Sequence, residues 1–176
     1  MSNVSISSLY PFRRVKIENC SQIISPDHGT VIFTELNPDM RFNPICHECG
    51  SKAEKNHSWH SRPLNDLKLG HANNHIILRY RKIYCPNCGI KVEQLNVTEP
   101  GGPAVTNRLA QYIYDLCKHM TVQEVADHLN LDWKTVKNID KHFLEKEFDQ
   151  TDYNHSGFLA INDFSFVSHS FLLPLL

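Results

Sequence analysis

The pattern of hydrophobic and polar positions changes once along the chain, from a period of two to a period of 3.6. In residues 12–36, Val15 and Ile17 alternate with charged neighbours, and a Ser-Pro-Asp-His-Gly turn precedes a second apolar run. This pattern predicts a β-hairpin. Residues 74–84 predict another strong strand, which leads directly into Cys85. The first half of the chain is therefore expected to be rich in β-structure.

The second half of the chain follows a breaker cluster, Glu-Pro-Gly-Gly-Pro at residues 99–103. Beyond it the apolar positions recur at helical spacing, and Thr106 can cap the first helix. The expected apolar face of that helix comprises Leu109, Ile113, Leu116 and Cys117. This half of the chain is therefore expected to be helical.

A helix-turn-helix pattern follows the first predicted helix. Thr121 and Glu124 form the signature of a capping box. Asn130 stands where the turn requires a left-handed backbone, and Asp132 can cap the next helix. A generic helical hairpin is the alternative interpretation. In a DNA-binding helix-turn-helix, the second helix would present its outward residues to the major groove. Those residues are Trp133, Lys134, Thr135, Lys137 and Asn138.

Composition adds a local charge asymmetry. The 176 residues are 41% hydrophobic and 21% charged, which is typical of a globular chain. The chain lacks a run of 18 apolar residues and a secretory signal pattern, so neither a membrane span nor export is expected. The net charge is −1, yet nine basic and four acidic residues between Arg41 and Glu93 make that segment +5. Its basic strand is expected to contact DNA phosphates, with a solvated strand face as the alternative. The candidate contacts are Arg79, Arg81 and Lys82.

Four of the six cysteines form two matching Cys-x-x-Cys-Gly motifs, Cys46 with Cys49 and Cys85 with Cys88. A two-residue gap lets both thiolates of a pair bind one tetrahedral Zn²⁺ from a tight turn. The sequence therefore predicts one structural zinc ion with four cysteine ligands. The 35 residues between Cys49 and Cys85 exceed the usual spacing of about 15–20, so they are expected to form structure of their own.

Other interpretations of the cysteines stay open at this point. Disulfides are one, although the expected reducing compartment disfavours them. A Cys₂His₂ site using the first pair with His57 and His60 is another, but it leaves the second pair unexplained. His47 is expected to be a solvated loop residue. Cys20 and Cys117 are expected to be small buried residues.

The order of these parts resembles the zinc-finger-bearing ISL3-type family of bacterial insertion-sequence transposases. The motifs that carry the resemblance are the hairpin, the two cysteine motifs, Arg-Pro-Leu-Asn-Asp-Leu at 62–67, the helix-turn-helix, and Leu-Ala-Ile-Asn-Asp-Phe at 159–164. The resemblance covers about residues 12–166. It implies that the zinc finger and helix-turn-helix bind the terminal repeats of the element. It also implies a following RNase H-like domain, whose three carboxylates hold two metal ions.

The expected fold class is α+β, with a β-rich zinc ribbon, an all-helical helix-turn-helix module and the orphan first strand of a truncated RNase H-like domain. The expected divisions are a flexible N-terminus (1–11), the hairpin and zinc ribbon (12–97), a linker (98–105), the helix-turn-helix (106–148) and the start of the catalytic domain (149–176).

The catalytic motif departs from the family pattern. Asn162 stands where the family carries its first catalytic aspartate, and a one-residue slip to Asp163 is the alternative. No later position offers the other two carboxylates, so we expect no catalytic activity. The expected function is DNA binding by the N-terminal part of a transposase in the bacterial cytoplasm, at the nucleoid. The expected partners are double-stranded transposon ends, a second copy of the chain or full-length transposase, and no membrane. The alternative is a zinc-stabilised regulatory or protein-interaction fragment that modulates full-length transposase.

Overall fold

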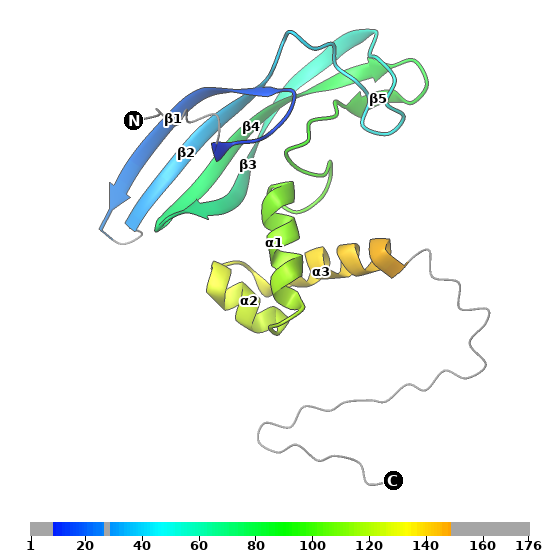
Figure 1. The fold of residues 1–176 in the computed structure, drawn as a ribbon. Helices are drawn as coiled ribbons and strands as arrows, with labels where there is room; N and C mark the ends of the chain where they lie inside the picture. Colours follow the sequence, from blue (N-terminus) through cyan, green and yellow to red (C-terminus); the bar gives the residue numbers. More distant parts are fainter. Residues whose placement is uncertain (1–8, 27–28, 149–176) are drawn as a thin grey trace, which may run out of the picture.

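The computed structural model describes residues 9–26 and 29–148. Five strands form one sheet in the order β1-β2-β4-β3, with β5 paired to β4 (Figure 1). β2 and β4 run parallel, and the other pairs are antiparallel. The predicted hairpin and the predicted strand before Cys85 are both present. The strands are β1 (Val15–Ser25), β2 (Gly29–Pro38), β3 (Lys55–Leu69), β4 (Ala72–Cys85) and β5 (Gly89–Val92).

The long segment between the cysteine motifs forms strand β3, which sequence periodicity did not reveal. Burial alternates along this strand from Ser58 onward, but the inward-facing residues before Leu64 are polar. Leu64 and Asp66 are the buried residues of the strand. Pro63 lies within the strand, opposite Ile77 of β4. A proline is tolerated there because β3 is an edge strand, whose outer N–H groups need no partner in the sheet. The β3–β4 hairpin is thus the structure that the unusual spacing required.

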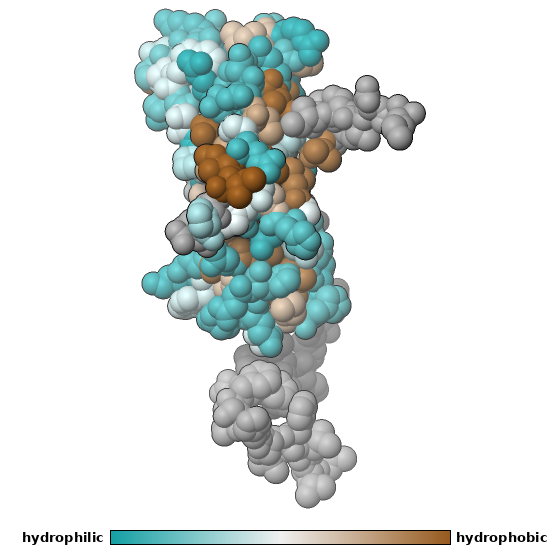
Figure 2. All heavy atoms as spheres, turned by 90° about the vertical axis from the view of Figure 1, so that its left-hand side faces the viewer, coloured by the Kyte–Doolittle hydropathy of each residue, from teal (hydrophilic) through white to brown (hydrophobic). Residues whose placement is uncertain are grey.

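The main core lies on one face of the sheet. Alternate residues of β4, such as Ile76 and Leu78, point into it. Ile23 and Ile24 of β1 are instead 53% and 76% exposed. Figure 2 shows a hydrophobic patch on the side of the molecule that β1 and β2 form. The buried members of the core are Tyr10, Leu36, Leu64, Ile76, Leu78, Leu95 and Val97.

The first residues described correct part of the predicted flexible N-terminus. Tyr10 is buried in the sheet core, where its hydroxyl donates to Asn74 Oδ1 (3.0 Å) and accepts from the Thr34 hydroxyl (2.7 Å). The Leu9 carbonyl accepts a hydrogen bond from Arg108 Nη1 (2.7 Å). Residues 9–11 are therefore held by the fold, because an aromatic ring with a satisfied hydroxyl gains by burial.

Three helices follow the sheet: α1 (Asn107–Cys117), α2 (Val122–Leu129) and α3 (Trp133–Phe148). The Thr106 cap is confirmed, as is the capping box of Thr121 with Glu124. Asn130 has the left-handed backbone expected of the turn (φ 54°, ψ 50°). The helices bury a second core, made of Val105, Leu109, Ile113, Val125, Ala126, Val136 and Ile139.

Replacing Thr121 with alanine should lower the free energy of unfolding by about 1 kcal/mol, because the first turn of α2 loses its side-chain acceptor. Hydrogen bonds from the Thr121 N–H and hydroxyl lower the pKa of Glu124. That stabilisation is present above the unfolded-state pKa and is lost as the pH falls through the folded-state pKa. Urea titrations at neutral and acidic pH would test both statements. Equal stability of the variant and the wild type at neutral pH would contradict the role of the cap.

The predicted linker is packed against the sheet. Its Gly-rich part forms a tight turn, in which Gly102 N donates to the Glu99 carbonyl (3.1 Å). The Asn65 N–H then donates to the Ala104 carbonyl (2.9 Å), and the Thr106 N–H donates to the Asn65 carbonyl (3.0 Å). The chain therefore enters α1 as a short extension of the sheet beside β3.

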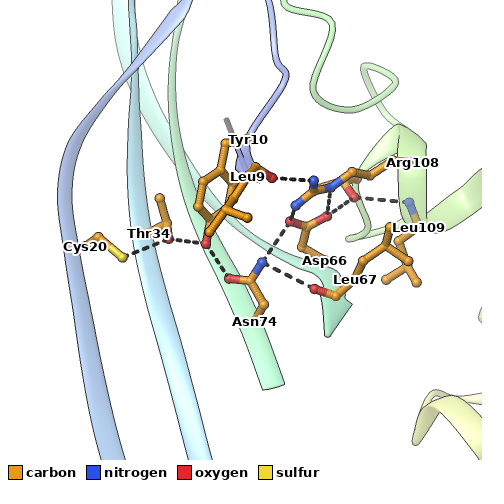
Figure 3. Close-up of polar contacts among 10 residues, drawn as sticks. Leu9, Tyr10, Cys20, Thr34, Asp66, Leu67, Asn74, Arg108 and Leu109 are labelled. Carbon is orange, nitrogen blue, oxygen red and sulfur yellow. Dashed lines mark hydrogen bonds and ion pairs between the residues drawn. The ribbon is translucent and has the colours of Figure 1, made fainter. Parts of the chain in front are cut away.

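A buried polar network joins the helices to the sheet (Figure 3). The Asp66 carboxylate, with a fully buried side chain, accepts hydrogen bonds from three residues. These are Arg108 (Nε at 2.7 Å), the Thr106 hydroxyl (2.6 Å) and Asn74 Nδ2 (2.9 Å). Arg108 also lies over the ring of Phe12 (5.0 Å). One carboxylate thus ties β3, β4 and the start of α1 together.

The predictions for the last part of the chain are not tested by the structure. The predicted strand at 158–166 and the position of Asn162 lie outside the described residues. Among the described helices, none has the length and apolar character needed to cross a membrane.

Candidate metal centre and nucleic-acid interface

Two tight turns carry the cysteine pairs. In the first, Gly50 N donates to the Cys46 carbonyl (2.9 Å), and Gly50 adopts a φ of +70°. In the second, Cys85 pairs with Gly89 across the β4–β5 hairpin, where Gly89 has a φ of +74°. Only glycine adopts such angles without steric cost, which explains the glycine after each cysteine pair.

The two turns bring the four cysteines together. The Sγ atoms of Cys46, Cys49, Cys85 and Cys88 all lie within 4.8 Å of one another. Four sulfurs on a tetrahedral Zn²⁺ at about 2.3 Å would lie about 3.8 Å apart, so the cluster has the size that zinc requires. Cys46 and Cys85 are buried against Ile83, and Cys49 is exposed. The donor set and its geometry fit one structural zinc ion.

Local hydrogen bonds shift the pKa of two thiols in the cluster. The hydroxyl and N–H of Ser51 lower the pKa of Cys49 to about 6. A hydrogen bond to Cys49, together with burial, raises the pKa of Cys88 to about 12. One thiolate is therefore already favoured at neutral pH, and a bound cation would favour the others.

The alternative roles of the cysteines and histidines are not supported. All six cysteines, which lie in the described part of the chain, have free thiols. His57 and His60 lie on β3 and contact Ser58, outside the cysteine cluster. His47 was expected to be a solvated loop residue. It is instead half-buried, and its Nδ1 lies 3.0 Å from the carbonyl oxygen of Val92 in β5.

The structure contradicts the prediction that Arg81 contacts DNA. Its side chain is 3% exposed and pairs with Glu93, which is 2% exposed. Arg81 Nε lies 2.9 Å and Nη2 2.5 Å from Glu93 Oε2, while the Arg81 N–H donates to Oε1 (2.8 Å). The β4–β5 hairpin places Glu93 just beyond the paired strand, beside Arg81. A guanidinium bound in this way supports the fold and does not face a phosphate.

Strand alternation separates the other two basic candidates of β4. Arg79 is exposed and lies 4.6 Å over the ring of Trp59. Lys82 is half-buried and pairs in register with Ser58, on the opposite face of the sheet. The three basic residues of this strand therefore do not form one surface.

The five residues predicted to face the major groove lie in the amino-terminal part of α3. Asp132 Oδ1 accepts from the N–H groups of Lys134 (2.9 Å) and Thr135 (3.3 Å), so it caps the helix as expected. Val136 and Ile139 are buried against the other helices. Thr135 is half-buried, and the other four candidates are exposed: Trp133, Lys134, Lys137 and Asn138.

A groove of about 640 Å³ lies between the amino end of α2 and this exposed side of α3. Trp133 and Lys137 both line this groove, and Lys137 Nζ lies 5.8 Å from the centre of the Trp133 ring. Lys141, one turn further along α3, also lines the groove, but the sequence pattern did not single it out. Its spacing of four from Lys137 was the signal that could have identified it.

Comparisons with known proteins agree with both parts of the site. Residues 43–88 match the zinc-finger of transposase IS204/IS1001/IS1096/IS1165, and residues 105–144 match the helix-turn-helix domain of transposase family ISL3. Over 140 residues the chain is 29% identical to the transposase for insertion sequence element IS1001 of Bordetella parapertussis. That match covers 79% of this chain and 34% of the relative, so it spans about a third of the relative's length. No solved structure matches the chain significantly.

Proposed function

We propose that this chain, which carries the zinc-finger and helix-turn-helix domains of ISL3-family transposases, binds double-stranded DNA at the ends of a bacterial insertion sequence. The proposal assigns DNA binding to the described residues and no step of strand transfer. DNA as the partner would place the protein at the bacterial nucleoid.

The observation that carries the proposal is the exposed amino end of α3. The chain turns through the left-handed Asn130, Asp132 caps the helix, and the first turn of α3 is exposed at Trp133 and Lys134. Lys137 and Asn138 offer a charged group and an amide donor, which are suited to phosphates and base edges in the major groove. Trp133 lies beside them and is 43% exposed. A helical hairpin with a purely structural role would not be stabilised by this exposure of an aromatic ring.

Replacing Lys137 with alanine should weaken binding to an element-end duplex roughly tenfold and reduce the salt slope by about one, since one phosphate contact is lost. Fluorescence anisotropy of the zinc-loaded chain, titrated at several salt concentrations, measures both quantities. Lys118→Ala is the matched control, because Lys118 pairs with Asp115 at the end of α1.

The contradicting outcomes are equally specific. Wild-type affinity that does not change with salt would show that phosphates are not contacted. An unchanged salt slope and affinity in the Lys137 variant would remove α3 from the interface. Equal affinity for element ends and unrelated duplexes would contradict the assignment to transposon ends while leaving DNA binding intact.

A further inference from the structure

A second group of basic and hydroxyl side chains lies on β3, away from α3. His57 Nδ1 lies 2.9 Å from Ser58 Oγ, and Ser58 Oγ lies 2.8 Å from His60 Nε2. The pairing of β3 with β4 shifts register between Asn56 and Ser58, so His57 is an additional residue in the strand. This bulge brings two neighbouring side chains to one site, where regular alternation would separate them.

Two lysines flank this histidine–serine group. Lys82 pairs in register with Ser58, and Lys55 pairs with Tyr84, with its Nζ 4.8 Å from the ring. His57 and Lys55 are exposed, so an anion can reach both from solvent. We call His57, Ser58, His60, Lys55 and Lys82 the β3 cluster.

The surroundings of the β3 cluster leave its positive charge largely unopposed. From β4, Tyr84 meets His57 edge-on (5.1 Å) and Tyr80 stacks on His60 (5.6 Å). From β5, the register places the apolar Ile90 and Val92 beside Tyr84 and Lys82. The one carboxylate next to the cluster in sequence is the exposed Glu54. Glu93, the acidic residue just after β5, is bound to Arg81 on the other face.

This arrangement has the chemistry of a phosphate site. When both rings are neutral, the serine hydroxyl and the two imidazoles carry three donors, and two of these are used in the hydrogen bonds among themselves. One donor then remains for a phosphate oxygen. Protonated imidazoles would each donate from both nitrogens, which adds charge and donors that a phosphate oxygen accepts. Histidine changes charge between about pH 5 and 8, so such a site binds phosphate better as the pH falls.

We infer that the β3 cluster binds a phosphate of the DNA backbone, as a contact separate from α3. The inference rests on the proposed DNA-binding function and adds a second point of contact, on the zinc-ribbon part. It gives a role to the side chains of His57, Ser58 and His60, which belong neither to the zinc site nor to α3.

The test compares the zinc-loaded wild type with the double variant His57→Gln and His60→Gln, using duplex DNA at fixed ionic strength between about pH 6 and pH 8. Glutamine keeps a polar side chain without the titratable charge. We expect the wild type to bind roughly tenfold more tightly at the lower pH, and the double variant to lose most of that change. Ser58→Ala should weaken binding about threefold to tenfold at both pH values.

Two controls separate this inference from the proposed function. His71→Gln alters an exposed histidine in the β3–β4 turn and should keep the wild-type pH response. Lys137→Ala should bind more weakly yet retain the same pH response. If the wild type binds no DNA, the proposed function fails and the inference falls with it. If the wild type binds through Lys137 but the double variant matches it in affinity and pH profile, the β3 cluster is not a phosphate site.

Discussion

Chelating the metal should unfold the zinc-ribbon end of the sheet and abolish tight DNA binding. The two cysteine turns meet at their sulfurs and at a small cluster around Ile83. A few hydrogen bonds also join them, such as Asn87 Nδ2 to Ser51 Oγ (2.9 Å). Without a cation, the four thiols would lie close together at this junction with no shared ligand, and Cys46 and Cys85 would be buried there. Structural zinc contributes roughly 10–16 kcal/mol of apparent binding free energy in zinc-finger peptides, which is more than a few hydrogen bonds between the turns can replace.

Metal analysis and thermal unfolding measure this effect. The wild type should contain one zinc ion per chain, and Cys49→Ser should lower both the zinc content and the melting temperature. Cys117→Ser is the matched control, since Cys117 lies on α1 away from the cluster. Zinc affinity should fall as the pH falls, because protons compete for the thiolates. Freshly purified wild type without zinc would refute the metal site.

Replacing Asp66 with alanine should lower the free energy of unfolding by about 3–5 kcal/mol. The variant leaves the Arg108 guanidinium without its carboxylate in a largely buried position. The Thr106 hydroxyl and the Asn74 amide lose their acceptor as well (Figure 3). We also expect the helices to separate from the sheet, because Asp66 joins β3 to the start of α1.

The control for this prediction is Asp115→Ala, which removes an exposed partner of Lys118 and should leave stability unchanged. Chemical denaturation measures both free energies. Limited proteolysis near residues 99–103 reports separation of the helices, since that turn is held between the two parts. A loss comparable to that of the Asp115 control would show that the network does not hold the two parts together.

The local features of the chain were predictable to the residue. The caps at Thr106, Thr121 and Asp132 were predicted, and so was the left-handed Asn130. A cap depends on a side chain and a backbone group within three residues of each other, so the sequence contains both partners. The cysteine ligands were predictable for a related reason, because each pair needs only one tight turn.

The contacts between distant residues were not predictable in this way. Arg81 looked like a phosphate contact, but the β4–β5 hairpin places Glu93 against it. The sequence of strand β3 lacks a clear alternation of hydrophobic and polar residues, and the charged Asp66 occupies one of its core positions. Asp66 is tolerated there because Arg108, 42 positions along the chain, supplies its counter-charge.

The sequence by itself determined the helix-turn-helix, the four zinc ligands and the order of the parts, because those depend on neighbours along the chain. The tertiary structure decided which basic residues remain on the surface and how the helices are held to the sheet. The physical reason is that burial of a charge depends on where its partner lies in space. A strand pattern shows that a side chain points to one face, but only the folded sheet shows what covers that face.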